Sequence, residues 1–502
     1  MAIRSGSPCV AKKISVSGAY DRFVQGEGLW HPAGNRLLVG SLAFLCEVRG
    51  GPPSGWPQVS LEPGGTGPPR RRAGLAEAFA SDSTFSETES AGRGFRLYFE
   101  VIWLVYFLTN SYNVIDEYLP IPSFYPMVGI YLLYFALVCP LQVSQVVAKP
   151  LFWVWSMTVV VPAAMYFLGS SATLSAWPSL VGRMSFFACL AGSAVLLSGP
   201  DAPRILRTAA RISLAIAVTL SFADLFFENP YNRAEVTGRT AGLYADTNTS
   251  AAAIGTLLLL SVDISKQSFK SMLVVGISVL AIISTQSRSG MIFSAILLAA
   301  YLFVPQGRGT FSLSSRLGIG IAGVFVLFLA VAVAPALIGL DTSGSWRITS
   351  LLSLDFSDPS SQGRLDVLSY AVSQFFDAFW SGHGLGSARF YDISSHNAYL
   401  ELAFEYGIGG LLLWVVLLLV PIVKSMRFGL SSSITVLMIT FQIFYYSLFS
   451  HTVPTFVVFA VFFAAVLTGA AYMNPDQSQT LESQGSLSLD SPPSQSYGRS
   501  VG

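Results

Sequence analysis

The fold is decided by long apolar stretches, of which residues 402–423 are typical: they read LAFEYGIGGLLLWVVLLLVPIV. A helix needs about 20 mainly apolar residues to cross a bilayer, and this stretch is long enough. Of the 502 residues in the chain, 52% are hydrophobic and 11% charged, with a mean hydropathy of +0.57. Soluble domains carry about 25% charged residues. The composition therefore excludes a disordered chain, a nucleic-acid-binding protein and an ordinary soluble enzyme, and it predicts an all-α membrane protein with many spans.

Apolar stretches of this kind occur twelve times along the chain. We expect transmembrane helices near residues 95–112, 121–142, 150–169, 178–198, 205–226, 249–265, 271–285, 289–305, 317–340, 402–423, 431–449 and 454–473. Every lysine lies ahead of the first helix or in a connection that follows an even-numbered helix. Because cytoplasmic loops are rich in Lys and Arg, that side is cytoplasmic and both termini lie inside. The longest connection, residues 341–401 between helices 9 and 10, is then expected to be an external loop.

The two ends of the chain differ from this membrane domain, which we assign to residues 95–473. Residues 1–94 are rich in Gly and Pro, and their one apolar patch, residues 37–48, is too short to cross a bilayer. They form either a disordered cytoplasmic extension or a segment upstream of the true start codon that is not part of the working protein. Residues 474–502 are rich in Ser and are expected to be a disordered cytoplasmic tail.

The cations on the outer side are all arginines. Arginine binds phosphate through a planar, permanently charged fork, whereas lysine is a flexible point charge. Arg239 and Arg288 have few acids near them in sequence, which favours an anionic ligand. For Arg347 and Arg389, ion pairs with the aspartates of the same loop are at least as good an explanation. Arg183, near the outer end of the fourth helix, either lines a cavity or extends to the headgroups, the commoner outcome at that depth.

His396 directly precedes the tenth predicted helix. Ser394, Ser395 or Asn397 can cap the start of that helix. The positive end of a helix dipole favours the neutral imidazole that a general base needs. A capping histidine at the interface explains the same residues equally well. Glu401 and Glu405 follow one turn apart, either as a structural pair, the safer interpretation, or to orient an acceptor.

Three segments together resemble the O-antigen ligase and polymerase family of bacterial membrane proteins. The first runs from Gly238-Arg239 to Asn248, and the second is Ser287-Arg288-Ser289-Gly290. The third runs from Gly363-Arg364 through Gly382-His383-Gly384-Leu385-Gly386 to His396-Asn397 and Gly407, with the His-x10-Gly spacing associated with the ligases. Thr247 stands where many relatives have proline, and the N-terminal extension has no counterpart in the family.

The resemblance implies about twelve helices with a partly helical periplasmic loop over a cavity at membrane level. It implies transfer of a glycan from an undecaprenyl-pyrophosphate donor to a sugar hydroxyl, on a growing glycan or a lipid A-core acceptor, at the periplasmic face of a bacterial inner membrane. The site residues that it implies are His396 as the catalytic base, Arg239, Arg288 and Arg364 on the pyrophosphate, and Asn248, Asn397, Glu401 and Gly407 in support.

Arginines that neutralise the pyrophosphate leaving group can replace a metal ion. The outer acids have no recognisable metal-ligand spacing, so we expect neither a metal nor a cofactor. A lipid-linked glycan flippase also needs arginines that face a pyrophosphate and is the nearest alternative, followed by other polytopic transporters. The choice between ligase and polymerase stays open, because both need the same cations and base. No nucleic-acid partner is expected.

Overall fold

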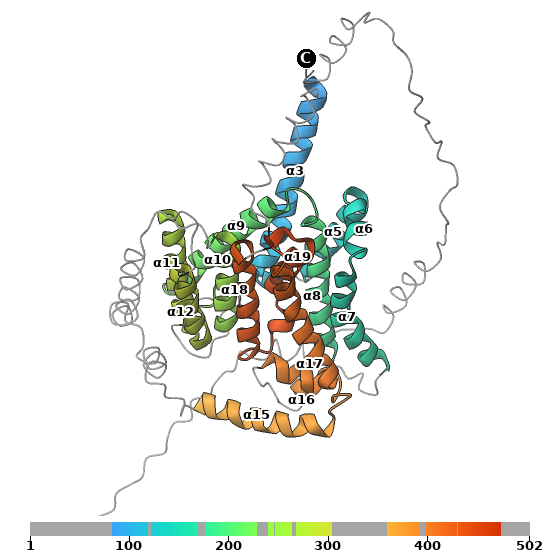
Figure 1. Cartoon of the computed structure of the whole chain (residues 1–502), viewed down its shortest axis with the longest axis vertical. Coiled ribbons are helices and arrows are strands. Elements are labelled where there is room, and N and C mark those ends of the chain that lie inside the picture. The colour runs from blue at the N-terminus through green and yellow to red at the C-terminus, as the bar shows by residue number, and fades with distance from the viewer. Residues whose placement is uncertain are drawn as a thin grey trace, which may run out of the picture. The chain divides into compact units, whose positions relative to one another are not determined.

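The computed structural model describes residues 83–118, 122–168, 176–227, 239–244, 246–263, 268–303, 359–390, 397–428 and 430–472. Contacts divide the chain into two compact units, Met1–Ala91 and Gly92–Gly502, of which the second holds nearly all of the described residues. Within the described ranges every regular element is helical (Figure 1). The predicted all-α class is therefore confirmed for these residues.

Helices occupy each predicted apolar stretch except residues 317–340, which lie outside the described residues. The α-helices are α3 (Ser83–Leu108), α4 (Ser111–Tyr118), α5 (Phe124–Val138), α6 (Pro140–Val147), α7 (Pro150–Leu168), α8 (Ala176–Leu196), α9 (Ala202–Ala223), α10 (Thr247–Ser261), α11 (Phe269–Ser284), α12 (Arg288–Phe303), α15 (Pro359–Asp377), α16 (Ser387–Phe390), α17 (Ala398–Ser425), α18 (Leu430–Ser447) and α19 (Val457–Thr468). Short 3₁₀ turns are η4 (Gly242–Tyr244), η5 (Val453–Thr455) and η6 (Ala470–Tyr472).

Within the part of the chain that the structure describes, four helices are long and apolar enough to cross a membrane by themselves: α7, α8, α9 and α17. The α5–α6 pair makes a fifth if it counts as one span. Helices α11, α12, α18 and α19 are apolar over shorter lengths. The number of spans, expected to be twelve, and the external position of residues 341–401 stay predictions, although α15 and α16 show that this connection is partly helical.

The second predicted span, residues 121–142, is not one straight helix. α5 and α6 meet at an angle of 100°. Pro140 is the first residue of α6, and Cys139 before it has φ −122° and ψ 34°, outside the helical region. A proline ring clashes with a helical conformation of the preceding residue, which ends α5 at Val138. The apolar pattern predicted the segment but not the bend.

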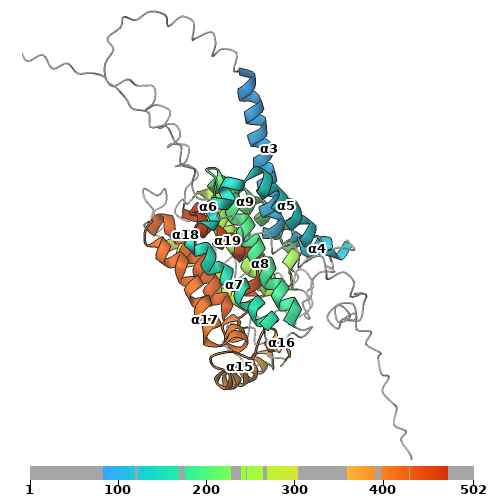
Figure 2. The same ribbon diagram turned by 90° about the vertical axis from the view of Figure 1, so that its right-hand side faces the viewer.

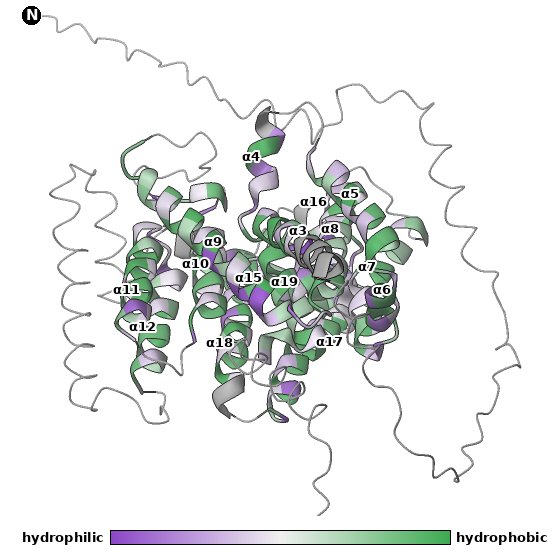
Figure 3. Ribbon diagram, turned by 90° about the horizontal axis from the view of Figure 1, so that it is seen from above, coloured by the Kyte–Doolittle hydropathy of each residue, from purple (hydrophilic) through white to green (hydrophobic). Residues whose placement is uncertain are grey.

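The centre of the second unit is α19, in which every residue from Val457 to Leu467 is buried. It packs most extensively against α8, and Figure 2 shows both among the surrounding helices. Large apolar side chains also cover the outer faces of α5, α7 and α17, and Figure 3 shows α5, α7 and α11 as mainly hydrophobic. Helices that are apolar on both their inner and outer faces are typical of a bundle surrounded by lipid.

Polar bonds inside the bundle fix α10 against α18. The Gln442 amide donates to the backbone oxygen of Ala252 at 2.7 Å, and the Thr256 hydroxyl donates to the Gln442 side-chain oxygen at 3.2 Å. Gly255 provides the space, because a Cβ there would lie 2.7 Å from the Gln442 amide nitrogen. Small residues and buried amides of this kind hold helices together where lipid surrounds them. The candidate site lies at the beginning of α10.

Candidate functional site

Arg288 is positioned by the tight turn between α11 and α12. Thr285 closes α11, and Gln286 adopts a left-handed φ of 52°, which reverses the chain. The Ser287 hydroxyl accepts the backbone N–H of Gly290 at 3.1 Å and so caps the start of α12. Arg288, half-buried, is the first residue of α12. The Ser-Arg-Ser-Gly motif is therefore a rigid turn that presents an arginine.

Asn248 ties this turn to the first sequence motif. Its side-chain oxygen accepts a hydrogen bond from the Ser287 hydroxyl at 2.7 Å, although the two residues are 39 positions apart. Glycine at position 290 allows the close approach, because a Cβ there would lie 2.7 Å from the Cβ of Ala251 on α10. The beginnings of α10 and α12 thus form one polar unit.

Arg239 is held against the same turn. Its Nε donates to the backbone oxygen of Thr285 at 3.3 Å, and an Nη donates to the hydroxyl of Thr247 at the start of α10. These two bonds go to neutral oxygens and fix the plane of the half-buried guanidinium. The structure thereby brings Arg239, Asn248 and the turn that carries Arg288 together. We call Arg239, Thr247, Asn248, Ser287 and Arg288 the arginine turn.

Asp224, at the end of α9, holds the chain that leads from Arg239 into α10. Its carboxylate accepts the backbone N–H groups of Ala241 and Gly242 at 2.9 and 2.7 Å. Gly242 has a left-handed φ of 55°, which opens the 3₁₀ turn η4. Tyr244 in η4 donates its hydroxyl to the backbone oxygen of Leu108 at 2.8 Å, and burial raises the pKa of that hydroxyl. Sequence reasoning had given Asp224 no role.

For two of the site residues expected in the third motif, the structure does not describe the side chain. His396 lies outside the described residues, and Arg364 is in α15 but its side chain is not described. The residue after the histidine is placed: the Asn397 side-chain oxygen accepts the backbone N–H groups of Tyr399 and Leu400 at 3.0 and 3.1 Å. Asn397 is therefore the N-cap of α17, one of the three capping residues considered.

Gly407 breaks α17 and receives the loop that follows α15. Its φ of 66° and ψ of −162° are not helical. The Ile408 N–H donates to the Phe379 backbone oxygen at 2.8 Å, and a Cβ at Gly407 would lie 2.5 Å from the Trp380 backbone oxygen. Gly382 adopts φ 66° at the same contact. Two glycine backbones in close contact therefore join the loop to α17.

Side chains complete this α17 junction. The buried Glu405 carboxylate accepts the Gly386 N–H at 2.9 Å. His383 stacks on Phe404 with ring centroids 4.4 Å apart, and its Nε2 lies 2.9 Å from the Gln374 backbone oxygen. Because carbonyl oxygens only accept, Nε2 carries the proton in this contact. Glu405 and His383 thus have structural roles, and α15 lies across the end of the bundle beneath α17 (Figure 1).

Helix α18 connects the start of α17 to the arginine turn. The Tyr399 hydroxyl donates to the backbone oxygen of Phe444 on α18 at 3.1 Å. Tyr446, two residues further along α18, lines a small cavity together with Asn248 and Thr249 of α10. The helix that follows His396 and the helix that begins beside the arginine turn therefore pack on the same segment of α18.

Arg183 is buried rather than extended to a surface. Its side chain lies over the ring of Tyr406, with the guanidinium carbon 5.9 Å from the ring centroid, and 6% of the residue is exposed. The carboxylates of Glu401 and Glu405 attract it. Arg183 and Tyr406 both line a cavity of about 40 Å³ between α7, α8, α17 and η5. Of the two alternatives considered for Arg183, the structure shows the cavity-lining one.

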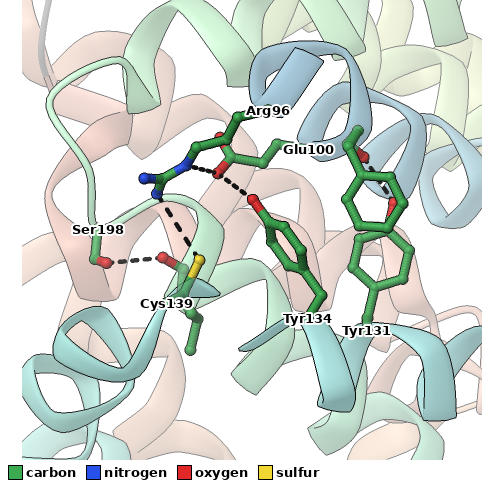
Figure 4. Close-up of polar contacts among 8 residues, drawn as sticks. Arg96, Glu100, Tyr131, Tyr134, Cys139 and Ser198 are labelled. Carbon is green, nitrogen blue, oxygen red and sulfur yellow. Dashed lines mark hydrogen bonds and ion pairs between the residues drawn. The ribbon is translucent and has the colours of Figure 1, made fainter. Parts of the chain in front are cut away.

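The sequence did not reveal a partly buried ion pair near the α5–α6 bend. Arg96 Nε donates to the Glu100 carboxylate at 2.7 Å, and the Tyr134 hydroxyl donates to the same oxygen at 3.2 Å (Figure 4). Another guanidinium nitrogen lies 3.8 Å from the Cys139 sulfur. The signal was available, because Glu100 is a lone acid within the first predicted span and intramembrane acids are rarely without a partner.

The model of the family described as O-Antigen ligase matches residues 273–415, from within α11 to within α17. Residues 273–415 are thus similar to the O-antigen ligase family. The resemblance drawn from the three motifs is thereby confirmed, and a role in glycan ligation or polymerisation is supported. We call the matched residues, 273–415, the ligase segment. It includes Arg288, Arg364, His396 and Gly407, whereas Arg239 and Asn248 precede it. No curated protein matches the chain.

Proposed function

We propose that the protein transfers a glycan from an undecaprenyl-pyrophosphate donor to an acceptor sugar hydroxyl at the periplasmic face of a bacterial inner membrane. The observation that carries the proposal is the arginine turn, in which Arg239 of one motif is bonded to the turn that carries Arg288 of another, at the beginnings of α10 and α12. The ligase segment on α11–α17 agrees with this activity.

The chemistry places the heaviest electrostatic demand on the leaving group. As the bond between the anomeric carbon and the pyrophosphate oxygen breaks, the pyrophosphate gains negative charge. Arg239 and Arg288 stabilise that charge, and Arg364 adds a further contact. Because Arg239 is held by Thr285 and Thr247, the positive charge needs no rearrangement during the reaction. Pre-oriented charge of this kind lowers the barrier most where water is excluded.

His396 completes the reaction as the general base. Asn397 caps α17, and His396 is the residue before it in sequence. The positive end of a helix favours the neutral imidazole that this role needs. The imidazole accepts the proton of the acceptor hydroxyl while its oxygen attacks the anomeric carbon from the side opposite the pyrophosphate. The products are an extended glycan with inverted linkage, a protonated histidine and a free lipid pyrophosphate.

The test replaces His396 with Ala in a host that lacks the native gene, with surface glycan and lipid-linked glycan both sized on gels. Long chains stranded on the lipid carrier, with none at the surface, indicate a ligase. Loss of long chains everywhere, with single repeat units remaining, indicates a polymerase. Normal glycan at normal protein level, beside a clear defect in the deletion strain, would remove His396 from catalysis and favour the flippase.

A further inference from the structure

Two lysines from distant parts of the chain meet at the end of α19. Lys424, in the last turn of α17, donates to the backbone oxygens of Val466 and Leu467 at 2.6 and 3.2 Å. Lys149, directly before α7, donates to the same Leu467 oxygen at 3.4 Å. The last carbonyl groups of a helix have no partner within the helix and attract cations, so both ammonium groups are fixed where α19 ends.

The positive charge at this point is larger than the end of one helix can balance. Arg427 adds a third cation, and both it and Lys149 are close enough to repel Lys424. The end of a helix carries only about half a negative charge. Among the described residues no acid forms an ion pair with any of the three cations, and the charges that act on Lys424 include no acid. A bound anion would relieve this repulsion.

The three cations can still donate hydrogen bonds to an anion. An ammonium group has three N–H donors, so the bonds to α19 leave two donors on Lys149 and one on Lys424. Both lysines are half-buried, and Arg427 is exposed. The arginine fork presents a pair of donors that fits two phosphate oxygens. We call Lys149, Lys424 and Arg427 the cation cluster.

Large apolar side chains beside the cation cluster are exposed. Met426 and Phe428 flank the arginine and are 82% and 46% exposed. Trp153, one turn into α7, is 54% exposed and donates its indole N–H to the Val147 backbone oxygen at 2.9 Å. Aromatic and basic side chains mix in this way where a membrane protein meets the lipid headgroups. An anion that carries apolar chains therefore suits this surface better than a free phosphate does.

We propose that the cation cluster binds the phosphate group of one anionic membrane phospholipid. The phosphate accepts the remaining N–H groups of Lys149 and Lys424 and the fork of Arg427, and the acyl chains lie along the exposed apolar faces of α7 and α17. The cation cluster lies where α17 ends, on the side predicted to be cytoplasmic, whereas the arginine turn is predicted on the other side. The inference therefore does not depend on the proposed function.

The test measures binding of dioleoylphosphatidylglycerol to the purified full chain in detergent by native mass spectrometry. Lys149→Gln combined with Arg427→Gln removes two charges and leaves Lys424 to bond the end of α19. The matched control, Arg204→Gln combined with Lys270→Gln, removes two exposed cations that are predicted on the same side and do not act on Lys424. The first pair should weaken binding about 30-fold and the control pair less than about twofold.

Three results would overturn the proposal. If the wild type binds dioleoylphosphatidylcholine as tightly as dioleoylphosphatidylglycerol, the cation cluster does not recognise an anionic headgroup. If inorganic phosphate displaces the lipid at equal concentration, the cation cluster binds a free anion. Equal weakening by the two pairs of substitutions, in protein of normal melting temperature, would mean general attraction to surface charge. The first two results need only the wild type, so they decide the question even if a variant does not fold.

Discussion

The two halves of the proposed site are built by different means. The arginine turn is held by side chains, with Arg239 on Thr285 and Thr247 and with Asn248 on Ser287. The α17 junction is held mainly by backbone, with Gly407 and Gly382 in direct contact. A change of side chain in the arginine turn should therefore alter chemistry and leave the fold intact. At the α17 junction, even one added methyl group should disturb the fold.

The sharpest test of this difference is Gly407→Ala beside Gly409→Ala. At Gly407 the new Cβ meets the Trp380 backbone oxygen at 2.5 Å and φ is 66°, whereas nothing lies within 4 Å of a Cβ at Gly409. Gly407→Ala should cost more than about 4 kcal/mol and leave little folded protein. Gly409→Ala should be neutral or should stabilise the helix by about 0.5–1 kcal/mol. Thermal unfolding in detergent measures both changes in stability. Equal melting temperatures for the two variants would contradict the close backbone contact at Gly407.

Arg239→Ala should change catalysis instead. Loss of one pre-oriented charge-stabilising donor lowers turnover about 10²–10³-fold. Arg239→Lys should recover little, because an ammonium cannot reproduce the planar fork that bonds Thr285 and Thr247. Glycan transfer by purified protein measures the rate, with melting temperature as the control. If the melting temperature falls together with the rate, Arg239 stabilises the fold and the loss of transfer is not evidence for a role in catalysis.

Arg96→Ala is the reference for an arginine with a structural role. It leaves the buried Glu100 carboxylate without its cation. Breaking a buried pair costs about 3–5 kcal/mol, and we expect about 2–3 kcal/mol because the Arg96 side chain is 38% exposed. Transfer per folded molecule should stay normal, and adding Glu100→Gln should restore much of the stability. A transfer defect in correctly folded Arg96→Ala protein would show that this ion pair contributes to glycan transfer and not only to stability.

Ser287→Ala should have the smallest effect. It removes the hydrogen bond to Asn248 and the cap of α12 together, which are worth about 1 kcal/mol each at most. We expect a drop of a few degrees in melting temperature and a fall in transfer of less than about tenfold. Asn248→Ala keeps the cap and loses the other bond, so it should reduce transfer with little change in melting temperature.

The sequence allowed the helical segments, the motifs of the arginine turn and a cap for α17 among Ser394, Ser395 and Asn397 to be predicted, because each depends on local pattern. Other features depend on contacts between distant segments. The approach of Gly382 to Gly407, the bonds from Ala241 and Gly242 to Asp224, and the cavity at Tyr446 involve partners that no spacing identifies. The bend at Pro140 was a local signal that the apolar pattern concealed.

We propose that the arginine turn binds the pyrophosphate of the donor. Binding of undecaprenyl pyrophosphate to the purified chain tests it most directly, with Arg288→Ala compared with Arg96→Ala. We predict that Arg288→Ala weakens binding about 100-fold, as expected for a charged contact of about 3 kcal/mol, and that Arg96→Ala binds like the wild type. Unchanged binding in Arg288→Ala, at normal melting temperature, would contradict the claim.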